Sequence, residues 1–212
     1  MTENVAHQDH PAEARIAAVD NLATTMTVTP FEIASREIAA ANLLALVAVR
    51  PLDPTGPEAH EKARRRAALL PSWQTLHQWE SAIAAALAEP HDEPKARVLC
   101  AIGLDGFQVR FSGPSGQTFV DVATSLLEEE RIGYQLTAAA WRKIWKDRRS
   151  PPPAADILAE AKAARQRAID AKDLVARALL ARGQAEKLSN APAGLDRAKS
   201  GCIHSLPRTG AR

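Results

Sequence analysis

The sequence predicts an all-α protein, in which an irregular helical bundle is followed by one long, Ala-rich C-terminal helix and the termini are disordered. Apolar residues make up 46% of the 212 residues, but much of this share is alanine, and only nine residues are Phe, Trp or Tyr. Several segments repeat apolar residues at spacings of three and four, as amphipathic helices do. The 14 prolines are expected to divide these segments into separate helices.

Four regions follow from this pattern. Residues 1–28 are polar and predict a flexible N-terminal arm, whereas residues 29–150 predict the helical bundle. Residues 151–188 predict the long helix. Residues 189–212 contain Gly, Pro, Ser and basic residues, so they predict a disordered basic tail.

The clearest helix start is the segment 29–32, which reads Thr-Pro-Phe-Glu. Thr29 can cap the helix, the proline suits the first helical position, and Glu32 completes a capping box. The helix is expected to run to about Val49, because Pro51 disfavours the helical conformation in the residue before it.

Five further helices are expected to complete the bundle, over residues 58–70, 73–89, 95–102, 119–131 and 137–148, with Thr137 as the cap of the last one. In the second of them, Trp79 belongs to an apolar stripe and is expected in the core. Between two of them, the stretch 103–117 contains four glycines and alternates Phe107, Val109 and Phe111. That alternation predicts a short strand or an extended connection.

The long helix is expected over residues 154–188, after three consecutive prolines, and could reach about 50 Å. A four-three spacing relates nine of its residues: Ile157, Ala161, Ala164, Ala168, Ala171, Val175, Ala178, Arg182 and Ala185. This is a heptad seam made mostly of alanine, which buries little surface. The helix is therefore expected either to pair weakly with another helix or to protrude singly, and the oligomeric state stays open.

Charge is distributed unevenly along the chain. The net charge is only +2, but residues 141–212 carry 16 Lys/Arg against 7 Asp/Glu, and the first 140 residues carry 11 against 18. A basic C-terminal third joined to an acidic body suggests an acidic partner for that third. The alternative interpretation is a long, solvated helix that is merely rich in Lys and Arg.

Three features predict a cytoplasmic protein. Cys100 and Cys202 are too few for a disulfide framework, so both thiols are expected to be free in a reducing compartment. The longest apolar run, over residues 38–49, is about twelve residues long, whereas a membrane span needs about twenty. The polar first residues, 1–11, contain no apolar signal core. We therefore predict no membrane association.

No constellation of residues predicts an active site. The metalloprotease His-Glu-x-x-His motif, the paired Cys-x-x-Cys, the dinucleotide fingerprint and the nucleophile elbow are all lacking from the sequence. His7 and His10 flank Asp9, but two histidines in a mobile arm do not predict a metal site. The sequence therefore favours a protein that is not an enzyme and has no cofactor.

A helix that is both aromatic and basic, near residues 137–148, is the best candidate for partner contact. Candidate nucleic-acid or partner contacts are Trp141, Arg142, Lys143, Lys146, Arg148, Arg149 and Arg165. In this hypothesis the cations bind phosphates and a tryptophan stacks on a base or enters a partner groove. In the alternative, Trp141 and Trp145 pack against Ile157 and Leu158 while the cations extend to solvent.

This part of the chain also resembles a known class of proteins. An Ala-rich helix with aromatic and Arg residues, over residues 138–149, leads through prolines into Pro-Ala-Ala-Asp-Ile-Leu at 153–158, and a helix over 119–132 precedes it. The arrangement is similar to that of small helical proteins of phages and mobile elements that load or inhibit the replicative helicase. The resemblance covers about residues 95–160. It implies an adaptor that binds a protein ring, without a nucleotide site of its own, and it assigns no site residue.

Three functions are therefore expected, in this order. The first is a non-enzymatic helical interaction protein, such as a DNA-replication accessory factor of a phage or mobile element whose partner is a replicative helicase. The second is a non-specific DNA-binding protein that uses the basic C-terminal third. The third is a structural protein that oligomerises, as a coiled coil or otherwise, through the long helix.

Overall fold

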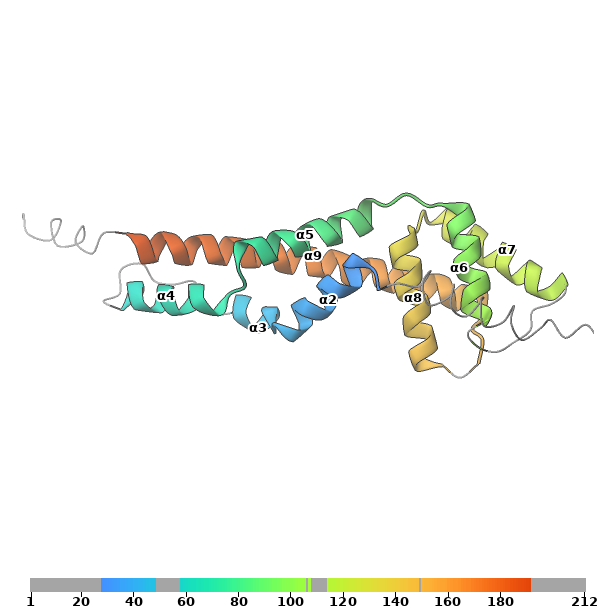
Figure 1. The fold of residues 1–212 in the computed structure, drawn as a ribbon, viewed down its shortest axis with the longest axis horizontal. Helices are drawn as coiled ribbons and strands as arrows, with labels where there is room; N and C mark the ends of the chain where they lie inside the picture. Colours follow the sequence, from blue (N-terminus) through green and yellow to red (C-terminus); the bar gives the residue numbers. More distant parts are fainter. Residues whose placement is uncertain (1–27, 49–57, 106, 108–113, 149, 192–212) are drawn as a thin grey trace, which may run out of the picture.

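A computed structural model describes residues 28–48, 58–105, 107, 114–148 and 150–191, and within these ranges all regular secondary structure is α-helical (Figure 1). The helices are α2 (Pro30–Ala40), α3 (Leu43–Val47), α4 (Ala59–Leu69), α5 (Trp73–Ala88), α6 (Glu93–Asp105), α7 (Pro114–Glu129), α8 (Tyr134–Asp147) and α9 (Ala154–Asn190). The predicted all-α class with a long C-terminal helix is confirmed. Nearly all of the predicted N-terminal arm and basic tail lies outside the described residues.

The predicted start of α2 is confirmed, but its predicted length is wrong. The Thr29 hydroxyl accepts the Glu32 amide at 3.3 Å, and the Glu32 carboxylate accepts the Thr29 amide at 3.0 Å, which completes the capping box. The helix ends near Asn42, whose φ of 47° lies in the left-handed region that asparagine tolerates. The chain turns there, and this lets Ile38 and Leu43 both enter the core.

The region predicted to be extended, residues 103–117, is helical at both of its ends. Helix α6 continues to Asp105, and α7 already begins at Pro114, while Val109 and Phe111 lie outside the described residues. Gly103 lies within α6, at a point where α8 packs closely against it. A Cβ atom at Gly103 would overlap the indole ring of Trp141, so the glycine lets α8 approach α6.

The start of α8 also differs from the prediction. Gly133, not Thr137, is the residue before the first helical turn, and α8 begins at Tyr134. Thr137 is fully buried inside the helix, where its hydroxyl donates to the Gly133 carbonyl at 3.0 Å. A threonine can satisfy its hydroxyl within a helix in this way, so its presence does not by itself mark a helix start.

Helix α9 is the element on which the rest of the molecule assembles. Its 37 residues give it a length of about 55 Å, and it runs along most of the described structure (Figure 1). Helices α2, α3, α4, α5, α7 and α8 all contact it. The predicted seam is confirmed as its buried face, because seven of the nine positions are buried and Ala171 and Arg182 are half-buried. Its partners are helices of the same chain, so of the two alternatives the protruding single helix is wrong.

Small side chains explain why so many helices fit against α9. Ala161, Ala164, Ala168, Ala178 and Ala185 are all buried on its inner face. Alanine lets helix backbones approach closely and costs no side-chain entropy. The core is therefore a narrow layer along α9, and its largest fully buried side chain, Trp141, lies in α8.

Two arginines of α9 bind the C-terminal ends of other helices. The guanidinium of Arg182 donates to the carbonyls of Ala67, Leu70 and Pro71, at 3.3, 3.0 and 2.7 Å. That of Arg165 donates to the carbonyls of Glu130 and Arg131 at 2.7 and 2.9 Å. The last carbonyls of a helix lack partners within it, so these arginines join α4 and α7 to α9.

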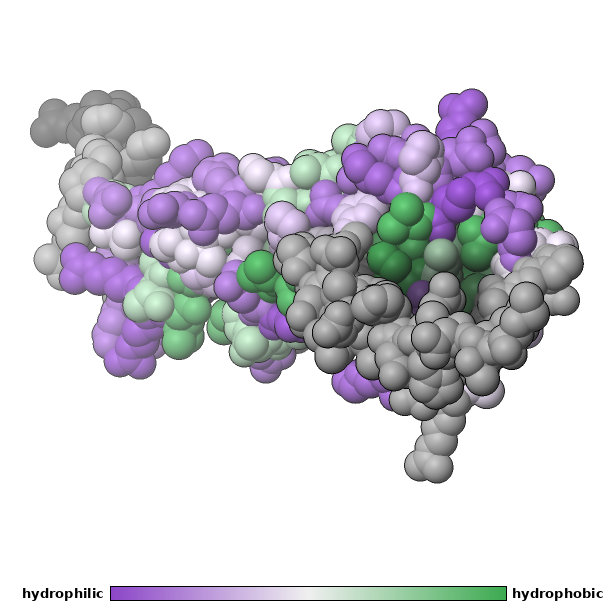
Figure 2. Space-filling model, turned by 45° about the vertical axis from the view of Figure 1, so that its right-hand side comes forward, coloured by the Kyte–Doolittle hydropathy of each residue, from purple (hydrophilic) through white to green (hydrophobic). Residues whose placement is uncertain are grey.

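On the face drawn in Figure 2, hydrophilic residues cover most of the described surface and hydrophobic residues form a few small patches. None of the described helices has the length and apolar character that crossing a membrane requires.

Candidate functional site

The tryptophan of the predicted contact set is not at the surface. Trp141 has 0% of its surface exposed and packs on Gly103, so the hypothesis that it stacks on a base is wrong. The half-buried Trp145 donates its indole N–H to the Gly103 carbonyl at 2.8 Å. Both tryptophans share one core cluster with Ile157 and Leu158. The alternative interpretation of the tryptophans therefore describes the structure.

Two of the predicted cations, Arg165 and Arg148, join the ends of helices, and one lies outside the described residues. Arg165 bonds to the end of α7, as described above. Arg148 forms an ion pair with Asp156 at 2.7 Å, which bridges the end of α8 and the start of α9. Arg149 lies outside the described residues.

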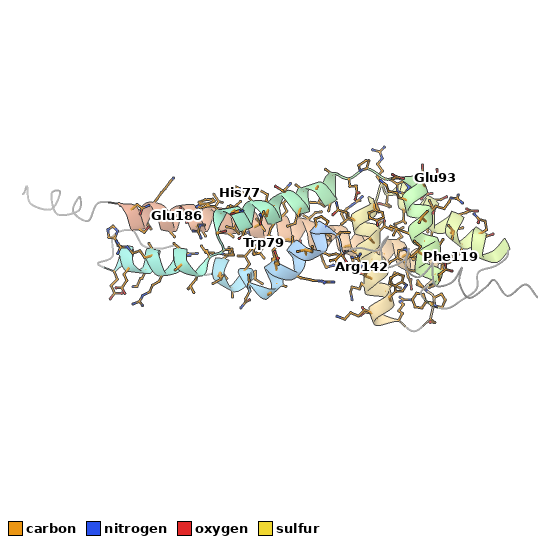
Figure 3. The ribbon with its side chains drawn as sticks, viewed as in Figure 1. His77, Trp79, Glu93, Phe119, Arg142 and Glu186 are labelled. Carbon is orange, nitrogen blue, oxygen red and sulfur yellow. The ribbon has the colours of Figure 1, made fainter. Side chains whose placement is uncertain are left out.

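The remaining three predicted residues, Arg142, Lys143 and Lys146, line one cleft. This cleft has a volume of about 490 Å³ and lies between α2, α8 and α9. Five cations line it: Arg36 from α2, Arg142, Lys143 and Lys146 from α8, and Arg167 from α9. Two carboxylates, those of Glu32 and Asp147, also line it. We call this site the cationic cleft, and Figure 3 shows Arg142 at the junction of α2 and α8.

The carboxylates of the cationic cleft are already neutralised by neighbouring cations. Glu32 pairs with Arg142, and Asp147 pairs with Lys143. Arg167 pairs with Glu160 of its own helix at 2.7 Å. Arg36 and Lys146 are exposed and form no ion pair with a described residue. They stand on different helices, so excess positive charge is present on two sides of the cleft.

The pairing of Lys143 with Asp147 favours the charged form of both groups. The hydrogen bond and charge of Asp147 raise the pKa of Lys143, and the hydrogen bond from Lys143 lowers the pKa of Asp147. Burial lowers the pKa of Arg142, but an arginine retains its proton in proteins. The described lining residues include no His or Cys. The chemistry that this arrangement supplies is binding of an anion by fixed positive charge.

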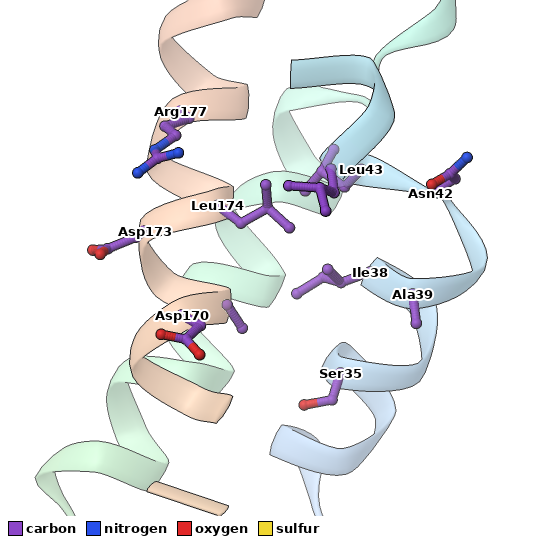
Figure 4. Close-up of a pocket in the computed structure, with 11 residues that line it drawn as sticks. Ser35, Ile38, Ala39, Asn42, Leu43, Asp170, Asp173, Leu174 and Arg177 are labelled. Carbon is purple, nitrogen blue, oxygen red and sulfur yellow. The ribbon is translucent and has the colours of Figure 1, made fainter. Parts of the chain in front are cut away.

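A second hollow adjoins the cationic cleft along α9. It has a volume of about 500 Å³, and Ser35 and Ala171 line both sites. We call it the apolar groove, after its aliphatic lining residues Ile38, Leu43, Leu44 and Leu174. Figure 4 shows Ile38 and Leu43 facing Leu174 across the groove, with Asp170, Asp173 and Arg177 along the α9 side.

Sequence reasoning missed Arg36, Arg167 and the apolar groove. The two arginines are 131 positions apart along the chain, and only the packing of α2 near α9 brings them to one cleft. The groove depends on the turn at Asn42, because that turn leaves Leu44 66% exposed instead of buried in a continuous helix. No local pattern in the sequence signals either feature.

The comparisons with known proteins add no relative. No protein-family model, no curated protein and no solved structure matches this chain. Its function is therefore argued from the cationic cleft and the apolar groove themselves.

Proposed function

We propose that this protein is a non-catalytic nucleic-acid-binding protein whose binding site is the cationic cleft. The observation that carries the proposal is the convergence of five Lys/Arg side chains from three helices on one cleft that contains only two carboxylates. Phosphates bound to Lys and Arg release counterions, and this release supplies most of the affinity of sequence-independent binding.

The proposed basic surface differs from the predicted one, which was the C-terminal third as a whole. Helix α9 carries seven Lys/Arg and five Asp/Glu, so it contributes little net charge. By contrast, residues 142–149 carry five Lys/Arg and one Asp. Positive charge is therefore concentrated at the end of α8, next to Arg36 and Arg167, and not along the long helix.

Binding of a labelled DNA duplex to charge-reversal variants tests the proposal. Arg36→Glu combined with Lys146→Glu reverses the two cations of the cleft that have no ion pair. We expect weaker binding, and a plot of log K against log salt whose slope is about 2 smaller than that of the unmodified protein.

The matched control is Arg64→Glu combined with Lys187→Glu. Both residues are exposed, lie on α4 and near the end of α9, and give the same change in net charge. The control is expected to retain most of the binding. An equal loss in the two double variants would mean that only overall charge matters, and the absence of binding by the unmodified protein at low salt would refute the function.

A second candidate function is the adaptor role expected from the resemblance to helicase loaders and inhibitors. The apolar groove supports it, because Leu44 is 66% exposed beside Leu174 at a site lined by two helices and α9. An exposed apolar patch of this kind suits a partner protein.

A pull-down from host lysate tests this candidate. We expect the unmodified protein to recover a replicative helicase, and Leu44→Asp to lose it. Val98→Asp is the control, since Val98 is an exposed apolar residue of α6 outside the groove. Recovery of chaperones alone, or equal recovery by both variants, would contradict the adaptor role.

A further inference from the structure

We infer that the cationic cleft binds the sugar-phosphate backbone of duplex nucleic acid, whatever its base sequence, and makes no stacking contact with the bases. This inference rests on the proposed function and specifies its ligand. It follows from the cations that line the cleft and from the burial of the aromatic side chains near it.

Aromatic side chains near the cleft are committed to the core. Phe31 lines the cleft but is only 3% exposed. Trp141, adjacent to Arg142 in α8, is fully buried, and Trp145, adjacent to Lys146, holds its N–H on the Gly103 carbonyl. Proteins that bind single strands stack successive bases on exposed aromatic rings. None of these three rings is placed to do so.

Cations on two walls of the cleft match a phosphate backbone. Arg36 extends from α2, and Lys143 and Lys146 extend from α8, with Arg167 of α9 also lining the cleft. Contacts to phosphates fix a protein on nucleic acid without reading its sequence. Arg142, Lys143 and Arg167 are paired with Glu32, Asp147 and Glu160. Arg36 and Lys146 therefore remain to contact about two phosphates.

The density of phosphate charge on the nucleic acid then determines whether the cleft prefers a duplex or a single strand. Without stacking, affinity depends on counterion release, which is about 0.9 per phosphate for a duplex and about 0.7 for a single strand. The duplex also carries two strands of phosphates along one axis. A cleft that offers excess cations and no exposed aromatic ring among its described lining residues is therefore expected to prefer the duplex.

The test is fluorescence anisotropy of the full chain with labelled probes: two duplexes of unrelated sequence, an oligothymidine strand and an oligoglutamate peptide. We expect equal affinities for the two duplexes within about twofold, a salt slope of about 2, and weaker binding of the single strand. The intrinsic tryptophan emission, recorded in the same titration, is expected to stay unchanged.

Each other outcome has a defined meaning. A preference for the single strand, quenching of tryptophan emission, or a tenfold difference between the duplexes would overturn this inference while leaving nucleic-acid binding intact. If the oligoglutamate peptide binds and no nucleic acid does, both the inference and the proposed function fail, and the cleft binds an acidic protein segment. The Arg36→Glu/Lys146→Glu variant assigns any observed binding to the cleft.

Discussion

Gly103 and Gly183 differ in what an added methyl group would contact. At Gly103 a Cβ atom would overlap the rigid indole of Trp141. At Gly183, in the C-terminal part of α9, the nearest atom to an added Cβ is in Trp73, at an ordinary distance of 3.6 Å. The first glycine is required by a close contact, and the second is only a weak helix former.

Substitution by alanine is therefore expected to change stability in opposite directions. Gly103→Ala should lower the free energy of unfolding by about 1–3 kcal/mol or more, because a well-packed core resists extra volume. Gly183→Ala should raise it by about 0.5–1 kcal/mol, since alanine favours helix. Urea denaturation of both variants measures this, and a stabilising Gly103→Ala would show that the contact between α6 and α8 is loose.

The Cys100 thiol gives the protein a pH dependence at alkaline pH. Burial raises its pKa from 9.0 to about 11. Between these values the unfolded chain releases the thiol proton and the folded chain keeps it, so the free energy of unfolding falls as pH rises. The stabilisation is complete below about pH 9 and is lost by about pH 11, with an upper magnitude of about 3 kcal/mol.

Comparison with Cys100→Ala isolates this effect from other groups that titrate. Unfolding free energies of both proteins are measured from about pH 8 to about pH 11. The unmodified protein should lose more stability across that range than the variant does. Parallel pH profiles would mean that the thiol titrates alike in the folded and unfolded chains.

Helix ends, at the scale of the elements, depend on contacts from distant residues. Arg182 bonds to three carbonyls at the end of α4 and also forms an ion pair with Glu186 at 3.0 Å. The same Glu186 accepts the indole N–H of Trp73 at 2.9 Å. One arginine therefore joins α9 to the end of α4 and, through Glu186, to the start of α5.

Arg182→Met keeps the aliphatic stem but removes the hydrogen-bond donors. We expect the free energy of unfolding to fall by about 1–3 kcal/mol, because the part-buried carbonyls at the end of α4 lose their partners. Hydrogen exchange should accelerate most in α4. Arg177→Met, at an exposed position of the same helix, is the control and should stay within about 0.5 kcal/mol of the unmodified protein.

Element boundaries show where local sequence is sufficient and where it is not. The capping box at Thr29 and the apolar stripe around Trp79 are local patterns, and both predictions are confirmed. The turn at Asn42 and the helical Gly103 were mispredicted, because distant contacts decide them: Leu43 enters the core, and Trp141 fills the space beside Gly103. Tertiary packing overrides local propensity at such positions.

The candidate site follows the same division. Arg142, Lys143 and Lys146 lie within five residues and were predicted together from one helix. Arg36 and Arg167 joined them only through the fold, and the buried Trp141 was assigned to the surface in one of two interpretations. A cluster of Lys and Arg in the sequence predicts local positive charge. Whether a neighbouring aromatic ring is buried depends on how the whole core packs.

Across the whole molecule, α9 takes the place of a conventional central core. Helices α4, α5, α7 and α8 pack extensively against this one element, so removing it would expose their apolar faces together. Such faces are stable only when they are covered. The bundle over residues 29–150 is therefore expected to depend on α9 for its folding.

Truncation after Ser150 tests this dependence. The shortened chain should lose cooperative thermal unfolding and much of its helical circular dichroism, whereas a chain truncated after Ala191 should retain both. Sedimentation of the shorter chain should reveal aggregation or an expanded monomer. If it stays compact and unfolds cooperatively, the bundle is an independent domain.

The position of α9 in the chain also affects events during protein synthesis. A ribosome makes α2 to α8 before it makes the surface that covers them, and domains usually fold as they emerge. Here the early helices lack the buried face of α9 until residue 190 or so has left the exit tunnel. Nascent chains should thus require protection by chaperones for nearly the entire time of translation, and premature termination should yield fragments that proteases remove quickly.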